Sequence, residues 1–223
     1  RLVRGAIPSP AMLADDAPLP ETPPGTPKPE EPPARAAQAL EALQTWLESA
    51  PCDELRRLAP LCAALARNSP LGLRTTLPGP TGERNTYRLL PRASVLCIAD
   101  DDADRLFQLA HVLAAGTRAV WPENPRTQQL HARLPADVQS RIRRAADPVS
   151  APCDAALVHG EAATVRSWNR RLARRDGPIV GLQACARGER RLGAIRLDGL
   201  MLERSLSVDT TAAGGNASLL TID

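Results

Sequence analysis

Short apolar segments alternate with helical segments over the second half of the chain, and this pattern restricts the fold more than any other feature. Four short segments rich in β-formers read as strands, namely residues 95–99, which reads as buried, 118–121, 155–159 and 179–184. Helical segments lie between them, namely 103–115 closed by Gly116, 126–134, 136–146 and 161–175. Such alternation predicts an α/β fold with a parallel sheet covered on both faces. We therefore expect a Rossmann-like domain over residues 76–199.

The first third of the chain predicts a linker followed by a pair of helices. Eight prolines fall between Pro18 and Pro33, so residues 15–35 are expected to form an extended linker rather than a helix or a central strand. Residues 36–75 then predict two helices, the second one capped by Asp53. The apolar stripes that carry this prediction are Leu40, Leu43, Trp46 and Leu47 in the first helix, and Leu55, Leu58, Cys62 and Leu65 in the second.

Residues 200–223 predict a β-strand, or flap, that continues into a tail. The segment 200–208 reads as a β-run, and 210–218 is rich in small residues. Such a tail has little apolar surface to bury against itself, so we expect it to dock on another surface. Its glycines allow close approach, and its Thr, Asn and Ser side chains can bond to backbone amides. The docking residues are expected to be Ser205, Ser207, Thr210, Gly214, Gly215, Asn216, Ser218, Leu219 and Leu220.

Charge and cysteine usage restrict the class of protein. The net charge of +3 is mild, and Lys28 is the single lysine. The arginine-rich stretches 141–144 and 166–175 are expected to be solvated faces or ion-pair partners, because stacking aromatics beside them are missing apart from Trp168. An arginine-rich nucleic-acid binder is therefore disfavoured. The five scattered cysteines predict reduced thiols in a cytoplasmic protein, and no segment has the ~18 apolar residues of a membrane span.

The turn after the first predicted strand argues against a dinucleotide site. Rossmann domains place glycines there, so that the backbone reaches a pyrophosphate at a helix N-terminus. Here the turn carries four carboxylates, Asp100, Asp101, Asp102 and Asp104, which suit the helix dipole but repel phosphate. No cofactor site is therefore expected in this segment.

The sequence also gives little evidence for a metal site or for a catalytic nucleophile. The three histidines, His111, His131 and His159, have no partner at metal-ligand spacing, so no metal site is expected, and His159 is expected to be a satisfied edge histidine at a strand end. Gly181–Cys185 loosely resembles the Gly-Gln-x-Cys nucleophile motif of aldehyde dehydrogenases, but its spacing departs by one residue. A thiol without an activating base is a weak catalyst, so no catalytic residue is expected here.

Four stretches resemble the C-terminal region of the long proline utilization A family, the bifunctional bacterial enzymes that oxidise proline to glutamate. They are residues 77–92, 95–100, 176–189 and the tail 201–223. The resemblance implies a non-catalytic domain with the aldehyde dehydrogenase superfamily fold. It also implies that residues 1–14 end a preceding aldehyde dehydrogenase domain and that residue 1 is a cut within a longer chain. In the family, the last domain is a lid on the passage for the intermediate, and the terminal motif, here 205–223, supports the semialdehyde dehydrogenase.

The resemblance also implies cofactors and partners of the parent enzyme. FAD and NAD belong to the parent and neither is expected in this segment. The expected partners are the preceding dehydrogenase domains of the same polypeptide, in a cytoplasmic homo-oligomer. Binding of DNA depends on an N-terminal DNA-binding domain of the parent, and peripheral association with the inner membrane is left open. The main alternative is a free-standing Rossmann-like protein that binds a nucleotide or a partner.

Overall fold

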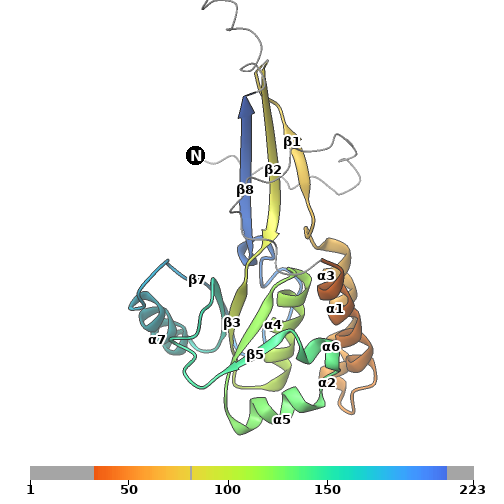
Figure 1. Cartoon of the computed structure of the whole chain (residues 1–223). Helices are drawn as coiled ribbons and strands as arrows, with labels where there is room; N and C mark the ends of the chain where they lie inside the picture. The colour runs from red at the N-terminus through yellow and green to blue at the C-terminus, as the bar shows by residue number, and fades with distance from the viewer. Residues whose placement is uncertain (1–32, 81, 210–223) are drawn as a thin grey trace, which may run out of the picture. The chain divides into compact units, whose positions relative to one another are not determined.

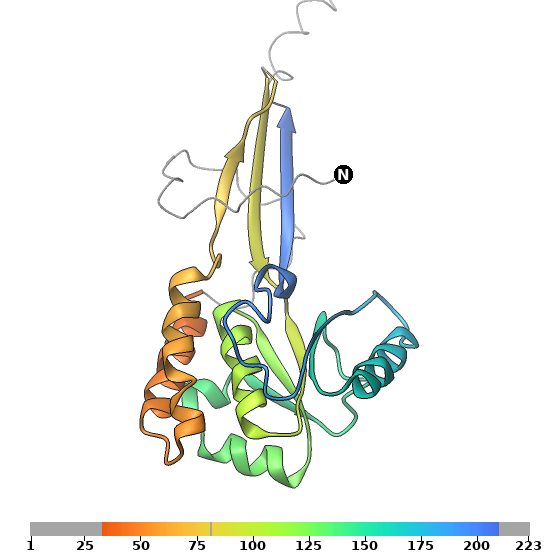
Figure 2. The same cartoon turned by 180° about the vertical axis from the view of Figure 1, so that it is seen from behind.

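The structure, a computed structural model, describes residues 33–80 and 82–209, which fall into two compact units. One unit, the flap, comprises residues 72–90 and 203–209, and the other, the sheet domain, comprises 33–71 and 91–202. Both are drawn in Figure 1 and, from behind, in Figure 2. None of the described helices is long and apolar enough to cross a membrane.

The sheet domain is built on a five-stranded parallel sheet in the order β5-β4-β3-β6-β7. Its strands are β3 (Ser94–Ile98), β4 (Arg118–Pro122), β5 (Ile142–Ala145), β6 (Ala155–His159) and β7 (Gly181–Cys185). Its connecting helices are α4 (Asp102–Ala114), α5 (Pro125–Arg133), α6 (Ala136–Gln139) and α7 (Ala162–Ala173). This parallel, helix-connected sheet confirms the predicted Rossmann-like α/β fold.

Helix α4 is buried on nearly all sides because it lies between the sheet and a second helical layer. It packs on β3 and β4 and against two further helices, α1 (Pro33–Glu48) and α3 (Ala59–Asn68) (Figure 1). Every residue from Ala103 to Ala114 is buried, including four polar ones, namely Asp104, Arg105, Gln108 and His111. Buried polar groups need hydrogen-bond partners, so this helix concentrates the polar chemistry of the domain.

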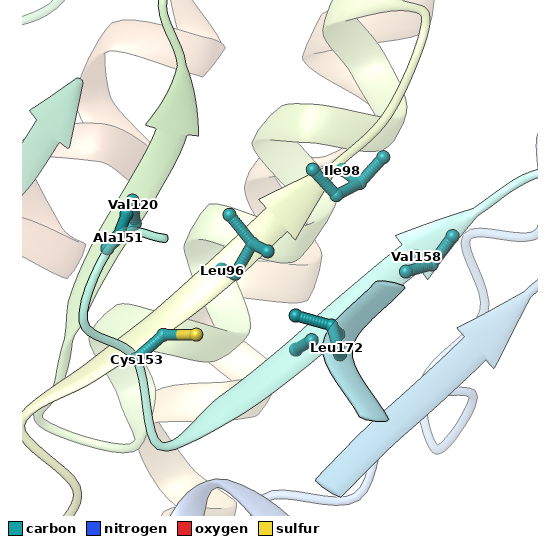
Figure 3. Close-up of a cluster of buried hydrophobic side chains, with 8 residues drawn as sticks. Leu96, Ile98, Val120, Ala151, Cys153, Val158 and Leu172 are labelled. Carbon is teal, nitrogen blue, oxygen red and sulfur yellow. The ribbon is translucent and has the colours of Figure 1, made fainter. Parts of the chain in front are cut away.

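The opposite face of the sheet carries a smaller apolar cluster (Figure 3). Leu96, Ile98, Val120 and Val158 project from β3, β4 and β6 toward Leu172 of α7 and toward the loop before β6. Strand side chains alternate between faces, so the residues between these project toward α4. The expectation that both faces of the sheet are covered is therefore met.

Three local predictions need correction. Residues 136–146 are not one helix, because α6 ends at Gln139 and Ile142–Ala145 form the edge strand β5, where Arg143 and Arg144 are exposed. Edge strands expose much of their surface, so β5 lacks the apolar run that marks a buried strand. The second helix is split into α2 (Asp53–Arg56) and α3, with Pro60 in the first turn of α3.

The third correction concerns helix ends. Cys52, not Asp53, occupies the N-cap position of α2, and Asp53 is its first residue. The first helix begins at Pro33, because proline is accepted in a first turn, where its missing N–H is unpaired in any case. The end of α4 agrees with prediction, since Gly116 has φ +76° and Thr117 N–H donates to Val112 O at 3.1 Å.

The flap is a three-stranded sheet in the order β1-β2-β8. Its strands are β1 (Arg74–Leu77), β2 (Glu83–Pro91) and β8 (Met201–Asp209), which extends the predicted β-run 200–208 by one residue. Strands β1 and β2 are antiparallel, and the arrows of β2 and β8 also run in opposite directions (Figure 1). The β-run in the sequence indicated β8, whereas β1, whose residues are largely exposed, was not recognised.

Candidate functional site

The carboxyl ends of β3 and β6 mark the place where a ligand would bind in this kind of fold. The chain builds outward from β3 through β4 to β5 and then reverses to β6 and β7, so the strand order switches between β3 and β6. Open α/β sheets bind ligands in the crevice at such a switch point. The turn after β3, the start of α4 and His159 at the end of β6 therefore define the candidate site.

The N-terminus of α4 is capped by carboxylates of the chain itself. Asp101 is the N-cap residue, and its Oδ1 accepts a hydrogen bond from the backbone N of Asp104 at 2.8 Å. Burial opposes ionisation of Asp101, but the bond from Asp104 and the charge of Arg190 outweigh it and hold its pKa below the ordinary value. A negative charge thus occupies the helix end that binds phosphate in dinucleotide-binding domains.

A segment that follows β7, residues 186–191, lies over the same helix end, and we call it the switch-point loop (Figure 2). The backbone N of Gly188 donates to Asp104 Oδ2 at 3.0 Å. At the margin of the site, Arg187 forms an exposed ion pair with Asp100 at 2.6 Å. The loop therefore occupies the region where an incoming phosphate would meet α4.

Arg190 holds the switch-point loop to two separate helices. Its Nε lies 3.5 Å from Asp104 Oδ1, and its Nη1 lies 3.6 Å from Asp101 Oδ1. Its Nη2 lies 2.7 Å from Glu54 Oε1 on α2. The side chain of Asp104 is 1% exposed, and this burial, with the hydrogen bond to Asp101, raises its pKa despite the nearby guanidinium. Arg190 is thus the cation that pairs with Asp101 and Asp104 of the acidic turn.

His159 uses both of its ring nitrogens inside the protein. Gln108 Nε2 lies 2.8 Å from His159 Nδ1 and also donates to Ile98 O at 2.9 Å. His159 Nε2 lies 3.1 Å from Glu189 O. One tautomer satisfies every contact, with the amide of Gln108 donating to Nδ1 and Nε2–H donating to the carbonyl of Glu189. His159 is therefore satisfied, as predicted, but it is buried on the interior strand β6 rather than at an edge.

The other residues considered for chemistry are Cys185, His111 and His131. Cys185 ends β7 and is 4% exposed, and burial raises the pKa of its thiol to about 11. Its Sγ lies 3.8 Å from Ala194 O. His111 is buried in α4, and His131 lies near the surface beside Gln139 O. Within residues 33–80 and 82–209, no group of three or more His, Cys, Asp or Glu side chains is arranged to hold a metal ion.

Sequence reasoning missed most of the residues that fill this site. Gln108 and Arg190 belong to no recognisable motif. The one available signal was that Arg190 lies in a polar segment after the end of a strand, where ligand sites form in open α/β sheets. Arg105 was missed as well. It is 3% exposed, donates to Ala99 O at the end of β3 and lies with its guanidinium carbon 5.7 Å from the ring centroid of Trp121.

The predicted docking tail is placed only in part. Ser205 and Ser207 lie on β8, where the hydroxyl of Ser207 bonds to Asn85 Oδ1 of β2. The remaining residues of that prediction lie outside the described residues, namely Thr210, Gly214, Gly215, Asn216, Ser218, Leu219 and Leu220.

Comparison with known proteins places this geometry in a family. No family model matches the chain. The chain is 47% identical over 191 residues to the bifunctional protein PutA of Escherichia coli strain K12, which covers 85% of this chain and 14% of that protein. It is 38% identical over 158 residues to the bifunctional protein PutA of Rhizobium meliloti, covering 70% and 13% respectively. The chain thus spans only about a seventh of the length of the curated relatives it matches.

Solved structures of PutA and of aldehyde dehydrogenases have folds similar to that of this chain. A structure of proline utilization A with proline bound in remote sites has a TM-score of 0.58 and 27% identity, covering 70% of this chain and 20% of that chain. The NAD+ complex of an aldehyde dehydrogenase from Bacillus cereus has a TM-score of 0.52 and 16% identity, covering 72% and 40%, a likeness of fold alone.

The fold is that of an α/β domain of the aldehyde dehydrogenase type. Within that class, the curated relatives at 38–47% identity all carry one name. The chain matches the C-terminal region of PutA, and the resemblance read from residues 76–223 is confirmed.

Proposed function

We propose that this chain is the non-catalytic C-terminal part of a bifunctional PutA enzyme. The parent would oxidise proline with FAD and the resulting semialdehyde to glutamate with NAD, and both cofactors would bind in preceding domains of the same polypeptide. This part would cover the passage through which the intermediate moves. Its tail would dock on the dehydrogenase domain and support its active site.

The proposed non-catalytic role rests on one observation, namely that residues of the chain itself fill the switch point. Carboxylates cap α4, and the switch-point loop bonds to them through Gly188 and Arg190. A dinucleotide would have to displace Arg190 from three carboxylates before its phosphates could approach the helix. The buried thiol of Cys185 also supports this reading, since burial raises its pKa to about 11 and keeps it protonated at neutral pH.

We expect no saturable binding of NAD to the 223-residue chain. The physical reason is that the helix end that would bind pyrophosphate already holds Asp101 and faces Asp104. Isothermal titration calorimetry with NAD up to millimolar concentration measures this, with an active aldehyde dehydrogenase as positive control. Saturation at micromolar NAD that is lost in Asp101→Ala would favour the alternative of a free-standing nucleotide-binding protein.

The tail prediction is tested in the parent enzyme by truncation after Asp209, which leaves β8 complete. Leu219, Leu220 and Ile222 are the apolar side chains available for docking, and burying such side chains contributes ~1.5–3 kcal/mol each. We expect the semialdehyde dehydrogenase half-reaction to be strongly impaired and the flavin-dependent proline dehydrogenase half-reaction to be unchanged. Each half-reaction is assayed separately with its own substrate.

A matched control keeps the length of the tail. Leu219→Ala, Leu220→Ala and Ile222→Ala combined should reproduce the truncation, whereas Thr211→Ser, at a position outside the predicted docking set, should have no effect. Equal losses in both half-reactions would indicate general misfolding, and no loss in either would remove the tail from the proposal.

The covering role is tested by a separate measurement, the time course with which glutamate appears from proline. A lag that appears only in the truncated enzyme indicates that the intermediate escapes.

A further inference from the structure

One face of the flap is lined with arginine. Arg74 of β1 is directly opposite Arg88 of β2, and Arg84 shares the face of Arg88 because strand side chains alternate. On β8, Ser207 bonds to Asn85, which lies on the other face, so the alternating position Arg204 lies on the face of Arg88. We call the face with Arg74, Arg84, Arg88 and Arg204 the arginine face.

The arginines of this face repel one another. Like charges directly opposite in a sheet are destabilising, and Arg74 and Arg88 are in register. Partial burial, together with the charges of Arg204 and Arg74, lowers the pKa of Arg88 from its ordinary value. The arginine face is therefore a row of cations that spans all three strands.

The flap does not supply its own counter-charge to this row. Its acidic side chains, Glu83, Glu203 and Asp209, occupy the alternate positions of β2 and β8 and so belong to the other face. Within the part of the chain that the structure describes, the ion pairs involve none of the four arginines. The Nε of Arg84 is buried there without a hydrogen-bond partner. A partner for this face would have to be anionic.

The same chain contains an acidic segment of suitable length. Residues 15–21 carry Asp15, Asp16 and Glu21 and no basic residue. Pro18 and Pro20 lack backbone N–H groups and favour an extended conformation, in which Asp16 and Glu21 are about 16 Å apart at ~3.1 Å per residue. The arginine face measures about 10 Å across three strands and about 13 Å from Arg84 to Arg88. The spacings of the two sets of charges are therefore comparable.

We propose that residues 15–21 of this chain dock across the arginine face of the flap, with their carboxylates paired to arginines of β1, β2 and β8. Because Pro18 and Pro20 have no backbone N–H to donate, the proposed contact is made by side chains on the face rather than by a further strand at the edge. Single exposed ion pairs are weak, but attachment in one chain gives the segment a millimolar effective concentration. Docking also relieves the repulsion among the arginines and so stabilises the flap.

The test is a photo-crosslink in the full 223-residue chain. Leu19 is replaced by p-benzoylphenylalanine, and crosslinked peptides are identified by mass spectrometry. We expect crosslinks to peptides of β1, β2 or β8. Their yield should fall about fivefold at 0.5 M NaCl and in Arg88→Gln/Arg204→Gln, because both changes weaken exposed ion pairs. The matched control Arg166→Gln/Arg170→Gln neutralises two exposed arginines of α7 and should leave the yield unchanged.

Two further experiments complete the test. Charge exchange examines the ion pairs, and mixing isotope-labelled with unlabelled chains distinguishes crosslinks within one chain from crosslinks between two copies. Asp16→Arg/Glu21→Arg should abolish the crosslink, and adding Arg88→Glu/Arg204→Glu should restore it. The neutralised flap should remain folded, since the substitutions remove repulsion, and circular dichroism checks this. Crosslinks to α7, a yield that is insensitive to salt and to the flap variants, or crosslinks only between labelled and unlabelled copies would each overturn the proposal.

Discussion

Replacing Arg190 by leucine is expected to lower the free energy of unfolding of the 223-residue chain by about 2–3 kcal/mol at pH 7. The guanidinium of Arg190 faces Asp104, whose side chain is 1% exposed, and it also contacts Asp101 and Glu54. Its removal leaves a buried carboxylate without its cation, and breaking such a pair is more damaging than removing both partners. Urea unfolding followed by circular dichroism measures the change.

The control for this variant is Arg191→Leu. Arg191 is in the same loop, but its partner is Glu189 and its side chain is 73% exposed, so we expect a change within about 0.5 kcal/mol. Combining Arg190→Leu with Asp104→Asn should recover part of the loss, since the amide is uncharged and can still accept from Gly188 N–H. The loss should also shrink as the pH falls, because Asp104 then takes up a proton. Equal effects of the two arginine variants would contradict the role given to Arg190.

Acid is expected to destabilise the chain through His111. Burial is the main cause that lowers the pKa of this imidazole to about 4. Its Nδ1 lies 2.8 Å from Phe107 O, and its Nε2 is buried without a partner among the described residues. Protonation would therefore place a charged, unpaired N–H inside the layer between the sheet and α1.

The sign of the pH effect follows from this depressed pKa. Below about pH 6.5 the unfolded chain protonates His111 while the folded chain does not, so the folded state binds fewer protons. The contribution of neutral His111 is complete above pH 6.5 and is lost as the pH falls toward 4, by up to about 3 kcal/mol. We expect His111→Gln to flatten the dependence of the unfolding free energy on pH between 6.5 and 4.5. Equal slopes for His111→Gln and the parent chain would contradict the prediction.

Local signals in the sequence predicted much of the fold because they depend on neighbours along the chain. The apolar runs of β3, β4 and β6 identified interior strands, and Gly116 marked the end of α4. Strands at edges were harder to detect. Strand β5 contains exposed arginines and was taken for helix, and β1 was not recognised, because an edge strand needs hydrogen bonds from a partner more than an apolar face.

The contents of the candidate site could not be predicted from local patterns. The acidic turn at Asp100–Asp104 was visible in the sequence, but Arg190, which pairs with Asp101 and Asp104, is more than eighty residues away. The pairing of Gln108 with His159 joins α4 to β6 across fifty-one residues. Neither contact leaves a spacing signal, since each exists only after β3 and β6 become neighbours in the sheet.

The sequence by itself determined the alternation of strands and helices, the missing phosphate-binding glycines and the family resemblance of residues 76–223. Only the tertiary structure decided that α4 is enclosed on both sides and that the switch-point loop lies over its N-terminus. The physical reason is the range of the interactions. Periodicity and capping act within a few residues, whereas burial sets the protonation of Asp104 and His111, and burial arises only when distant segments pack together.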